Sequence, residues 1–330
     1  MNSADPKILI KGVRKQDRRL LSKTITLIES ARPDHQQLAR IIVDELLPHT
    51  GKAIRLGITG VPGVGKSTFI ESLGMSLVED GHRVAVLAVD PSSSRSGGSV
   101  MADKTRMEKL AVEENAFIRP SPSGGTLGGV ARKTRETMLV CEAAGFDVII
   151  VETVGVGQSE TTVASMVDFF LVLMLAGAGD ELQGIKRGVL ELADAIAINK
   201  ADGDNIKKAQ KAAKIYATAL HMLQPASPNW EPPVLTCSAL EMAGIDEIWQ
   251  TVMKFHKQFS HSGELEHKRQ KQALDWLWSM VEDELKQRFY NNPDIKQKLD
   301  QITRAVARGE TAPTLAADKL LFFLDNKRRV

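Results

Sequence analysis

The fold is decided by the stretch Gly60-Val61-Pro62-Gly63-Val64-Gly65-Lys66-Ser67-Thr68. Its spacing of glycine, lysine and serine is that of a phosphate-binding loop. The apolar run 54–58 before it predicts a strand, and apolar residues at helical spacing after it predict a helix. Glycines let backbone N–H groups converge on an anion, and a helix N-terminus adds the positive end of its dipole. The stretch therefore predicts a strand, a phosphate cradle and a helix in succession.

Two side chains of this loop suit a nucleoside triphosphate. Lys66 can reach the β- and γ-phosphates, and the Ser67 hydroxyl can ligate Mg²⁺. The alternative is a Gly-rich turn that matches by chance, which the flanking strand and helix disfavour. The predicted nucleotide-binding residues of the loop are Gly60, Val61, Pro62, Gly63, Val64, Gly65, Lys66, Ser67 and Thr68.

Composition excludes several classes of protein. The 330 residues carry a net charge of +2, which predicts no general affinity for nucleic acid or anionic membrane. Cys141 and Cys237 lie far apart in sequence, which suits a reducing cytoplasm and argues against a disulfide framework. We find no secretory signal and no apolar run long enough to span a bilayer, so we expect a cytoplasmic protein.

Three regions differ in their patterning. Residues 1–50 predict an N-terminal helical extension, with one helix ending near Pro33 and the next capped by Asp34 and closed by Pro48. Residues 51–256 alternate strands and helices, as in a P-loop domain. Residues 257–330 lose the strand signals and predict helices.

The alternating region predicts an α/β fold with a doubly wound, mostly parallel sheet. Its candidate strands are mostly continuous apolar runs, as expected for parallel strands covered on both faces. Ligands of such sheets bind beyond the carboxyl ends of the strands. The candidate strands are 54–58, 84–90, 148–151, 169–175, 195–199 and 234–237.

The last region carries wide apolar stripes. Such stripes form either an oligomer interface or a cap on the sheet, and the residues alone leave both open. The first stripe is Leu274, Leu277, Trp278, Val281 and Leu285, the second is Ile295, Leu299, Ile302 and Val306, and 314–324 predicts a third helix.

Two loops after later strands predict guanine recognition. Asn199-Lys200-Ala201-Asp202 fits the N-K-x-D pattern, in which a carboxylate accepts hydrogen bonds from N1–H and the 2-amino group of guanine. The stem of Lys200 can cover the flat face of the base. Cys237-Ser238-Ala239-Leu240 resembles the loop whose backbone contacts the guanine oxygen. A polar turn is the alternative for the first motif.

Acidic residues near strand ends are candidate metal and switch groups. Asp90 can hold Mg²⁺ directly or through water, unless it is an ordinary cap, and Asp103 is a second metal or water-positioning candidate. Glu152 stands where many GTPases carry Asp, and can still reach metal-bound water. Gly155 can offer an amide to the γ-phosphate, and Gln158 lies in the flexible stretch that follows.

A further loop, 177–186, is a candidate switch. Its glycines, acids and lysine follow a strand, although a solvated loop explains them equally well. Its candidate partner-binding residues are Asp180, Glu181, Gln183 and Lys186. The Gly-rich stretch 121–129 lacks a phosphate lysine at the right spacing, and we interpret it as a turn or interaction loop.

Together these motifs resemble the MeaB/ArgK GTPases. These are the methylmalonyl-CoA mutase-associated G proteins, P-loop GTPases of the SIMIBI class whose human relative is the MMAA protein. The resemblance covers nearly the whole chain, and its most specific piece is the run 152–160. One departure is Ser94-Arg95-Ser96, where relatives often carry a more apolar triplet, and this could alter the first switch.

The resemblance implies a GTPase that assists an adenosylcobalamin-dependent mutase by loading, protecting and reactivating it. It implies Mg²⁺ as cofactor, GTP and GDP as ligands, and homodimers joined through C-terminal helices. It assigns Asp90, Asp103 and Glu152 to the metal and switch regions, with Lys66, Glu152 and Asp103 as catalytic residues, and 180–186 to a third switch.

Two other functions remain open. A nickel-insertion GTPase would usually carry Cys/His metal sites, whereas the seven histidines here are scattered. A kinase of a transport binding protein would need to reach a periplasmic substrate and to place a base at an acceptor hydroxyl, for which we find no candidate.

Overall fold

A computed structural model describes residues 5–89, 107–120, 127–153, 159–177, 187–222 and 227–325. The chain divides into two compact units, residues 1–266 and 267–330. The predicted boundaries at 50 and 256 stay predictions. None of the helices described is long and apolar enough to span a membrane.

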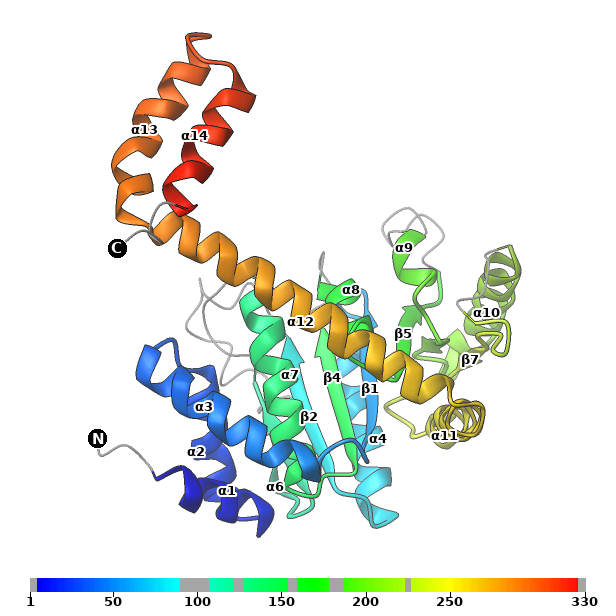
Figure 1. Cartoon of the computed structure of the whole chain (residues 1–330). Coiled ribbons are helices and arrows are strands. Elements are labelled where there is room, and N and C mark those ends of the chain that lie inside the picture. The colour runs from blue at the N-terminus through cyan, green and yellow to red at the C-terminus, as the bar shows by residue number, and fades with distance from the viewer. Residues whose placement is uncertain are drawn as a thin grey trace. The chain divides into compact units, whose positions relative to one another are not determined.

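The first unit is built on one seven-stranded parallel sheet with helices on both faces (Figure 1). The strand order is β3-β2-β4-β1-β5-β6-β7, and every paired strand runs parallel to its neighbour. This confirms the predicted α/β fold. The strands are β1 (Ile54–Gly60), β2 (Val84–Val89), β3 (Ala116–Arg119), β4 (Val148–Thr153), β5 (Phe169–Leu175), β6 (Ala195–Asn199) and β7 (Val234–Thr236).

Alternate strand residues build two separate cores. Side chains of a strand point to opposite faces in turn, so continuous apolar runs fill both layers. Leu56, Ile58 and Ile150 belong to the core under α4 (Lys66–Glu79), α6 (Glu108–Val112) and α11 (Ile245–Ser262). The opposite core lies under α1 (Pro6–Arg14), α2 (Arg18–Glu29), α3 (Pro33–Leu46), α7 (Leu127–Ala143), α8 (Ser159–Ala164) and α10 (Ile206–His221). The remaining short elements of the unit are η1 (Leu47–His49), α9 (Arg187–Leu190) and η3 (Gly203–Asn205).

The N-terminal helices differ from the prediction in two places. The chain turns between α1 and α2 at Gln16, whose φ is +63°, and Asp17 then caps α2 by accepting from Arg19 N and Leu20 N. The prediction that Asp34 caps the next helix is wrong. Arg32 is the N-cap and donates to the Asp34 carboxylate, because Pro33 takes the first helical position that its fixed φ suits.

These helices are attached to the edge of the sheet. Glu29 of α2 forms an ion pair with Arg119, the last residue of β3. Arg18 donates to the carbonyls of Glu113 and Glu114, just before β3, over 2.9 and 3.0 Å. The edge strand is therefore braced by the N-terminal extension.

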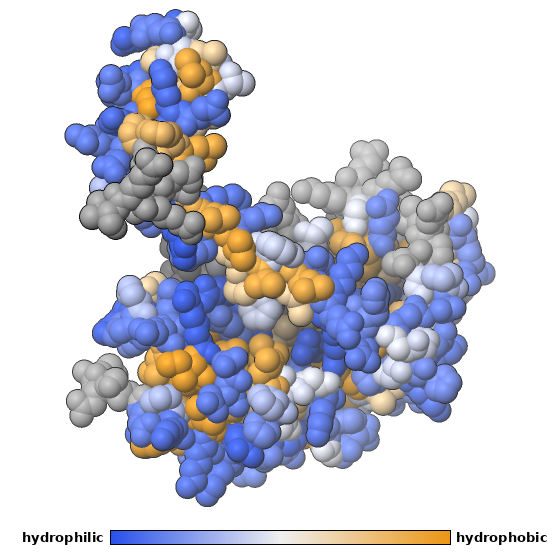
Figure 2. Space-filling view, in the orientation of Figure 1, coloured by the Kyte–Doolittle hydropathy of each residue, from blue (hydrophilic) through white to orange (hydrophobic). Residues whose placement is uncertain are grey.

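The second unit is helical. It contains most of α12 (Glu264–Asn291), then α13 (Pro293–Ala307) and α14 (Pro313–Asp325). Asn292 caps α13 by accepting from Asp294 N, and its amide donates to the Phe323 carbonyl of α14 over 3.2 Å. Ile295 is buried, while the first predicted stripe, on α12, is exposed. Figure 2 shows apolar surface running along α12.

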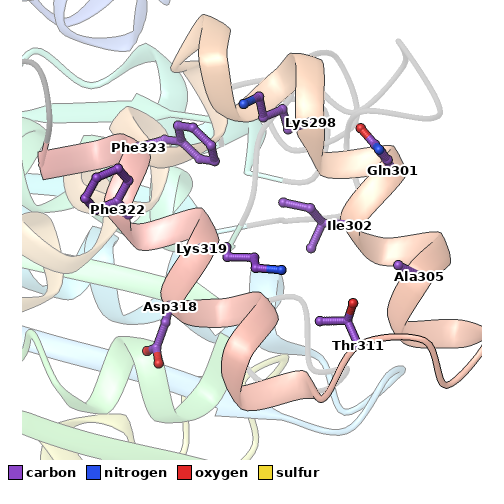
Figure 3. Close-up of a pocket in the computed structure, with 9 residues that line it drawn as sticks. All are labelled: Lys298, Gln301, Ile302, Ala305, Thr311, Asp318, Lys319, Phe322 and Phe323. Atoms are coloured by element: carbon purple, nitrogen blue, oxygen red, sulfur yellow. The ribbon is translucent and has the colours of Figure 1, made fainter.

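A groove lies between α13 and α14. Ile302 and Lys319 extend into it from the two helices (Figure 3), and the Lys298 ammonium sits 4.4 Å from the centroid of the Phe323 ring. The lining residues are Lys298, Gln301, Ile302, Ala305, Thr311, Asp318, Lys319, Phe322 and Phe323.

Candidate functional site

The phosphate loop leaves the carboxyl end of β1, at the centre of the sheet, and enters α4. Gly63 and Gly65 have φ values of +77° and +92°, the left-handed region that glycine tolerates. A Cβ on Gly60 would lie 2.5 Å from the Leu173 carbonyl of β5, so close strand packing also requires glycine there. The loop thus has the strand–loop–helix setting that its sequence predicts.

Lys66 lies at the first turn of α4 and is 9% exposed. Its Nζ donates to the carbonyls of Gly60 over 2.8 Å and Val61 over 3.4 Å. The ammonium group is therefore held beside the loop. Phosphate oxygens are stronger acceptors than carbonyl oxygens, so a bound triphosphate can take over these hydrogen bonds.

Asn199, the last residue of β6, links the two predicted nucleotide loops. Its Nδ2 donates to the Val64 carbonyl over 2.8 Å, and its Oδ1 accepts from Ala239 N over 3.1 Å. The side chain is 1% exposed, so both hydrogen bonds are shielded from water. One amide therefore fixes the loop after β7 against the phosphate loop.

Asp202 and Lys200 lie beside this link. The buried Ser238 hydroxyl donates to Asp202 Oδ2 over 2.6 Å, which fixes the orientation of the carboxylate. Lys200 has a φ of +60°, an uncommon conformation for a residue with a Cβ. A Cβ on Gly65 would lie 4.0 Å from Lys200 Cε, so the lysine stem runs next to the phosphate loop.

The loop after β7 is a tight turn. Ser238 N donates to the Ala243 carbonyl over 2.9 Å, and Ala243 N donates to the Ser238 carbonyl over 3.1 Å. The turn presents Leu240 outward with 81% exposure. Burial raises the pKa of the Cys237 thiol to about 12, so this cysteine is a neutral packing residue of the loop at physiological pH.

Glu152 comes from β4, opposite Ile58 of β1. Strand alternation places it on the same face as Ile150, the face that α4 covers. It is 8% exposed. The carboxylate therefore lies on the sheet face from which the phosphate loop opens into α4. The next residue, Thr153, turns to the opposite face and its hydroxyl lies 2.6 Å from that of Thr59.

Several predicted site residues lie outside the described residues. In the sequence they come after three described strands and before the next described helix, since β2 ends at Val89, β4 at Thr153 and β5 at Leu175. These residues are Asp90, Asp103, Gly155, Gln158, Asp180, Glu181, Gln183 and Lys186. In the described part of the chain, no three His, Cys, Asp or Glu residues gather as a metal site.

One contact at the site has no counterpart in the sequence prediction. Ser72 of α4 donates its hydroxyl to the Ala239 carbonyl over 2.7 Å. The only linear signal is a serine between Glu71 and Leu73 on a predicted helix. Such a signal does not reveal its partner.

The family described as "Methylmalonyl Co-A mutase-associated GTPase MeaB" matches residues 21–294 of this chain. GTPase ArgK of Escherichia coli is 49% identical over 96% of this chain and 96% of its own length. The mouse protein "Methylmalonic aciduria type A homolog, mitochondrial" is 46% identical over 95% of this chain and 78% of its own. A crystal structure described as LAO/AO transport system kinase shares 44% identity with a TM-score of 0.79, covering 98% of this chain and 99% of that one.

Proposed function

The chain belongs to the MeaB family of GTPases, which makes it a GTP hydrolase, and we propose that it is a chaperone of an adenosylcobalamin-dependent methylmalonyl-CoA mutase. In this role it loads intact cofactor, protects the mutase and reactivates it. The family description names the mutase, which supports this partner. The observation that carries nucleotide binding is the Asn199 amide that joins the phosphate loop to the loop after β7.

Phosphate binding is assigned to the loop 60–68. The helix α4 begins at Lys66, and a helix N-terminus suits an anion because its first backbone N–H groups have no acceptor within the helix. Lys66 supplies the positive charge opposite the β- and γ-phosphates. Its present hydrogen bonds to loop carbonyls keep the ammonium group close to where it acts. The loop therefore binds and orients the triphosphate.

Mg²⁺ is the proposed cofactor, and the described donors fit it. Ser67 offers a hydroxyl at the first turn of α4, and Glu152 offers a carboxylate on the same face of the sheet. Hard oxygen ligands of this kind suit Mg²⁺, with Asp90 and Asp103 as the further proposed ligands. A bound ion neutralises charge that develops on the phosphate oxygens.

Guanine selection is assigned to Asp202, Lys200 and the loop Cys237–Leu240. Ser238 donates to one oxygen of the Asp202 carboxylate and so restrains its orientation, while the remaining lone pairs can accept from the base edge. Adenine offers no proton at N1, so a carboxylate in this position would lose a donor. The stem of Lys200 covers the base from the side of Gly65.

We assign Glu152 and Asp103 to the positioning of the metal ion and of water, and the Gly155 amide to binding of the γ-phosphate. Coupling to the partner protein is assigned to Gln158, Asp180, Glu181, Gln183 and Lys186. Loops that follow parallel strands can be ordered by the γ-phosphate and released on hydrolysis. A partner that prefers one state must by linkage change nucleotide affinity.

Homodimerisation is proposed through the exposed stripe of α12. Its members are between 37% and 61% exposed, an apolar surface that a second copy can cover. The cytoplasm is the proposed compartment. Both cysteines are free and buried, as suits a reducing environment.

The test is the GTP hydrolysis rate against added methylmalonyl-CoA mutase. We expect the rate to change as the mutase saturates, and we expect Gln183→Ala and Lys186→Ala to weaken that response while basal nucleotide binding persists. An unchanged rate, with equal mutase affinity for the GDP-bound and GTP-analogue-bound protein, would reject the chaperone role and leave a plain GTPase.

A kinase remains the second candidate, since the solved relative is described as a transport system kinase. Incubation with GTP labelled on the γ-phosphate separates the two activities. Release of free phosphate supports the GTPase alone, and a labelled transport binding protein would support the kinase.

A further inference from the structure

We infer that Ser72 is a positioning residue that sets guanine selectivity. It lies on α4, between one and two turns beyond Ser67, and so belongs to the helix that carries the phosphate loop. Its hydroxyl donates to the Ala239 carbonyl over 2.7 Å, and the residue is 8% exposed. The helix that binds the phosphates therefore also holds the loop after β7.

This contact closes a ring of hydrogen bonds. Ala239 donates its N–H to Asn199 Oδ1, and Asn199 donates in turn to the Val64 carbonyl in the phosphate loop. Ser72 joins the same residue, Ala239, to the helix that follows the phosphate loop. Both polar groups of Ala239 are thus fixed, one by β6 and one by α4. All members of this ring are buried, so water does not replace a lost hydrogen bond without a shift of the chain.

The consequence concerns one atom of the base. The inference rests on the proposed function, in which the loop Cys237–Leu240 contacts the 6-oxo group of guanine through its backbone. The N–H groups of Cys237, Ser238 and Ala239 already donate within the protein. The donor to the base is therefore the Leu240 N–H, which shares a peptide plane with the Ala239 carbonyl that Ser72 holds. A hydrogen bond weakens as its donor moves or tilts away from the acceptor. Removing the Ser72 hydroxyl leaves the Ala239 carbonyl buried without that donor, which favours a displaced peptide. Contact with the 6-oxo group should then weaken.

The 2-amino group of guanine is contacted elsewhere. Its proposed acceptor is Asp202, which is held by Ser238 and not by Ser72. Contact with the 6-oxo group therefore depends on Ser72, whereas contact with the 2-amino group depends on Ser238. A change at Ser72 should reduce discrimination at the 6-position and spare discrimination at the 2-position.

The experiment measures dissociation constants of the full chain for three triphosphates. GTP is compared with the 2-aminopurine riboside triphosphate, which lacks the 6-oxo group and the N1 proton, and with inosine triphosphate, which lacks the 2-amino group. Asp202, the proposed acceptor of the N1 proton, is held by Ser238, so the change in the first preference on substitution of Ser72 reports the contact with the 6-oxo group. For Ser72→Ala we expect the preference for GTP over the 2-aminopurine nucleotide to fall about threefold to tenfold, as for the loss of one buried hydrogen bond. The preference for GTP over inosine triphosphate should not change.

A matched control lies one turn further along α4. Ser76 donates its hydroxyl to Asp246 of α11 over 3.3 Å, and so to a helix rather than to Ala239. Ser76→Ala should leave both preferences unchanged. Ser72→Thr keeps the hydroxyl and should retain the preference for GTP over the 2-aminopurine nucleotide. Ser72→Cys keeps a side chain of similar size but offers only a weak S–H donor, so it should also lower the preference for GTP over the 2-aminopurine nucleotide. This variant is used in place of Ser72→Ala if Ser72→Ala does not fold.

The outcomes separate this inference from the proposed function. If the unsubstituted chain does not prefer GTP over the 2-aminopurine nucleotide, the proposed guanine site is wrong. If it does, and Ser72→Ala keeps that preference, Ser72 serves only to satisfy a buried carbonyl. Equal loss of both preferences would show general loosening and would also overturn the inference.

Discussion

The Ser238 hydroxyl donates to Oδ2 of Asp202 over 2.6 Å, so that a buried serine of one loop fixes the carboxylate of another. The two residues follow neighbouring strands of the sheet, β7 and β6. Because the carboxyl ends of parallel strands meet at one edge, residues distant in sequence form one recognition surface.

Asp202→Asn should change the base that the chain prefers. The substitution replaces one acceptor oxygen with an N–H donor, so the affinity for GTP should fall about tenfold or more. The affinity for xanthosine triphosphate should rise relative to that for GTP. Competition binding with both nucleotides measures this. Asp204→Asn alters a nearby exposed carboxylate and should leave the preference as it is. If the unsubstituted chain binds ATP as tightly as GTP, the assignment of Asp202 is wrong.

Lys66→Ala removes the charge opposite the triphosphate. We expect nucleotide affinity or kcat/KM for GTP to fall at least about tenfold, or about 1.4 kcal/mol. Steady-state phosphate release checks this, with Lys52→Ala, an exposed lysine before β1, as the control. Hydrolysis at an unchanged kcat/KM in Lys66→Ala would contradict the role of this residue.

Much of the fold follows from the sequence because the central strands are continuous apolar runs. Among the strands that the structure describes, only β3 is missing from the prediction. It has four residues, Ala116–Arg119, and its outer edge pairs with no described strand, so neither length nor periodicity distinguishes it. The turn at Gln16 is also missing, since a positive φ at glutamine has no sequence signature. The wrong N-cap prediction at Asp34 has a different cause, because a proline such as Pro33 can either follow the end of one helix or take the first position of the next.

The loop motifs of the site can be predicted from the sequence, whereas the hydrogen bonds that hold these loops in place cannot. Phosphate and guanine motifs have fixed spacing, so Lys66 and Asp202 are visible in the linear sequence. The contact of Ser72 with Ala239 joins residues 167 positions apart. No periodicity encodes such a pair, since it depends on how α4 packs beside the end of β7.

Glu142→Gln should destabilise the first unit. The Glu142 carboxylate accepts from Arg55 Nε over 2.6 Å and from the Gly51 N–H, and its side chain is 1% exposed. The substitution leaves Arg55, itself 13% exposed, without its counter-charge, and we expect a loss of about 3 kcal/mol. Urea unfolding measures this. Glu231→Gln breaks an exposed pair with His221 and should change stability by less than about 0.5 kcal/mol. Equal losses in both variants would contradict the assignment.

Stability should depend on pH through Glu136 of α7. Burial raises the pKa of this carboxyl, against the attraction of Arg132. Between the unfolded pKa near 4.5 and the raised folded value, the native state binds more protons, so the free energy of unfolding falls as pH rises through this window.

Glu136→Gln removes this dependence. The variant should gain stability relative to the unsubstituted chain as pH rises from 4 to 7, measured by urea unfolding at each pH. Glu114→Gln, at an exposed position, should follow the unsubstituted chain. A stability difference that stays constant with pH would show that Glu136 does not titrate in this range.

The exposed stripe on α12 should hold two copies together. Leu277→Glu combined with Trp278→Glu places charge within an apolar contact and should convert dimers to monomers, read by light scattering after size exclusion. Asp283→Lys, on the opposite side of the helix, is the control. A chain that is monomeric before any substitution rejects the interface.

The packing of α1 limits how far the chain can be shortened for recombinant expression. The family match begins at residue 21, inside α2, so a truncation there deletes α1 with Leu9 and Val13, both 0% exposed. Their loss uncovers apolar surface around Ile42 and Leu46 of α3. Such a fragment keeps every nucleotide motif yet should collect in inclusion bodies, and only a chain that retains α1 should yield soluble protein for assay.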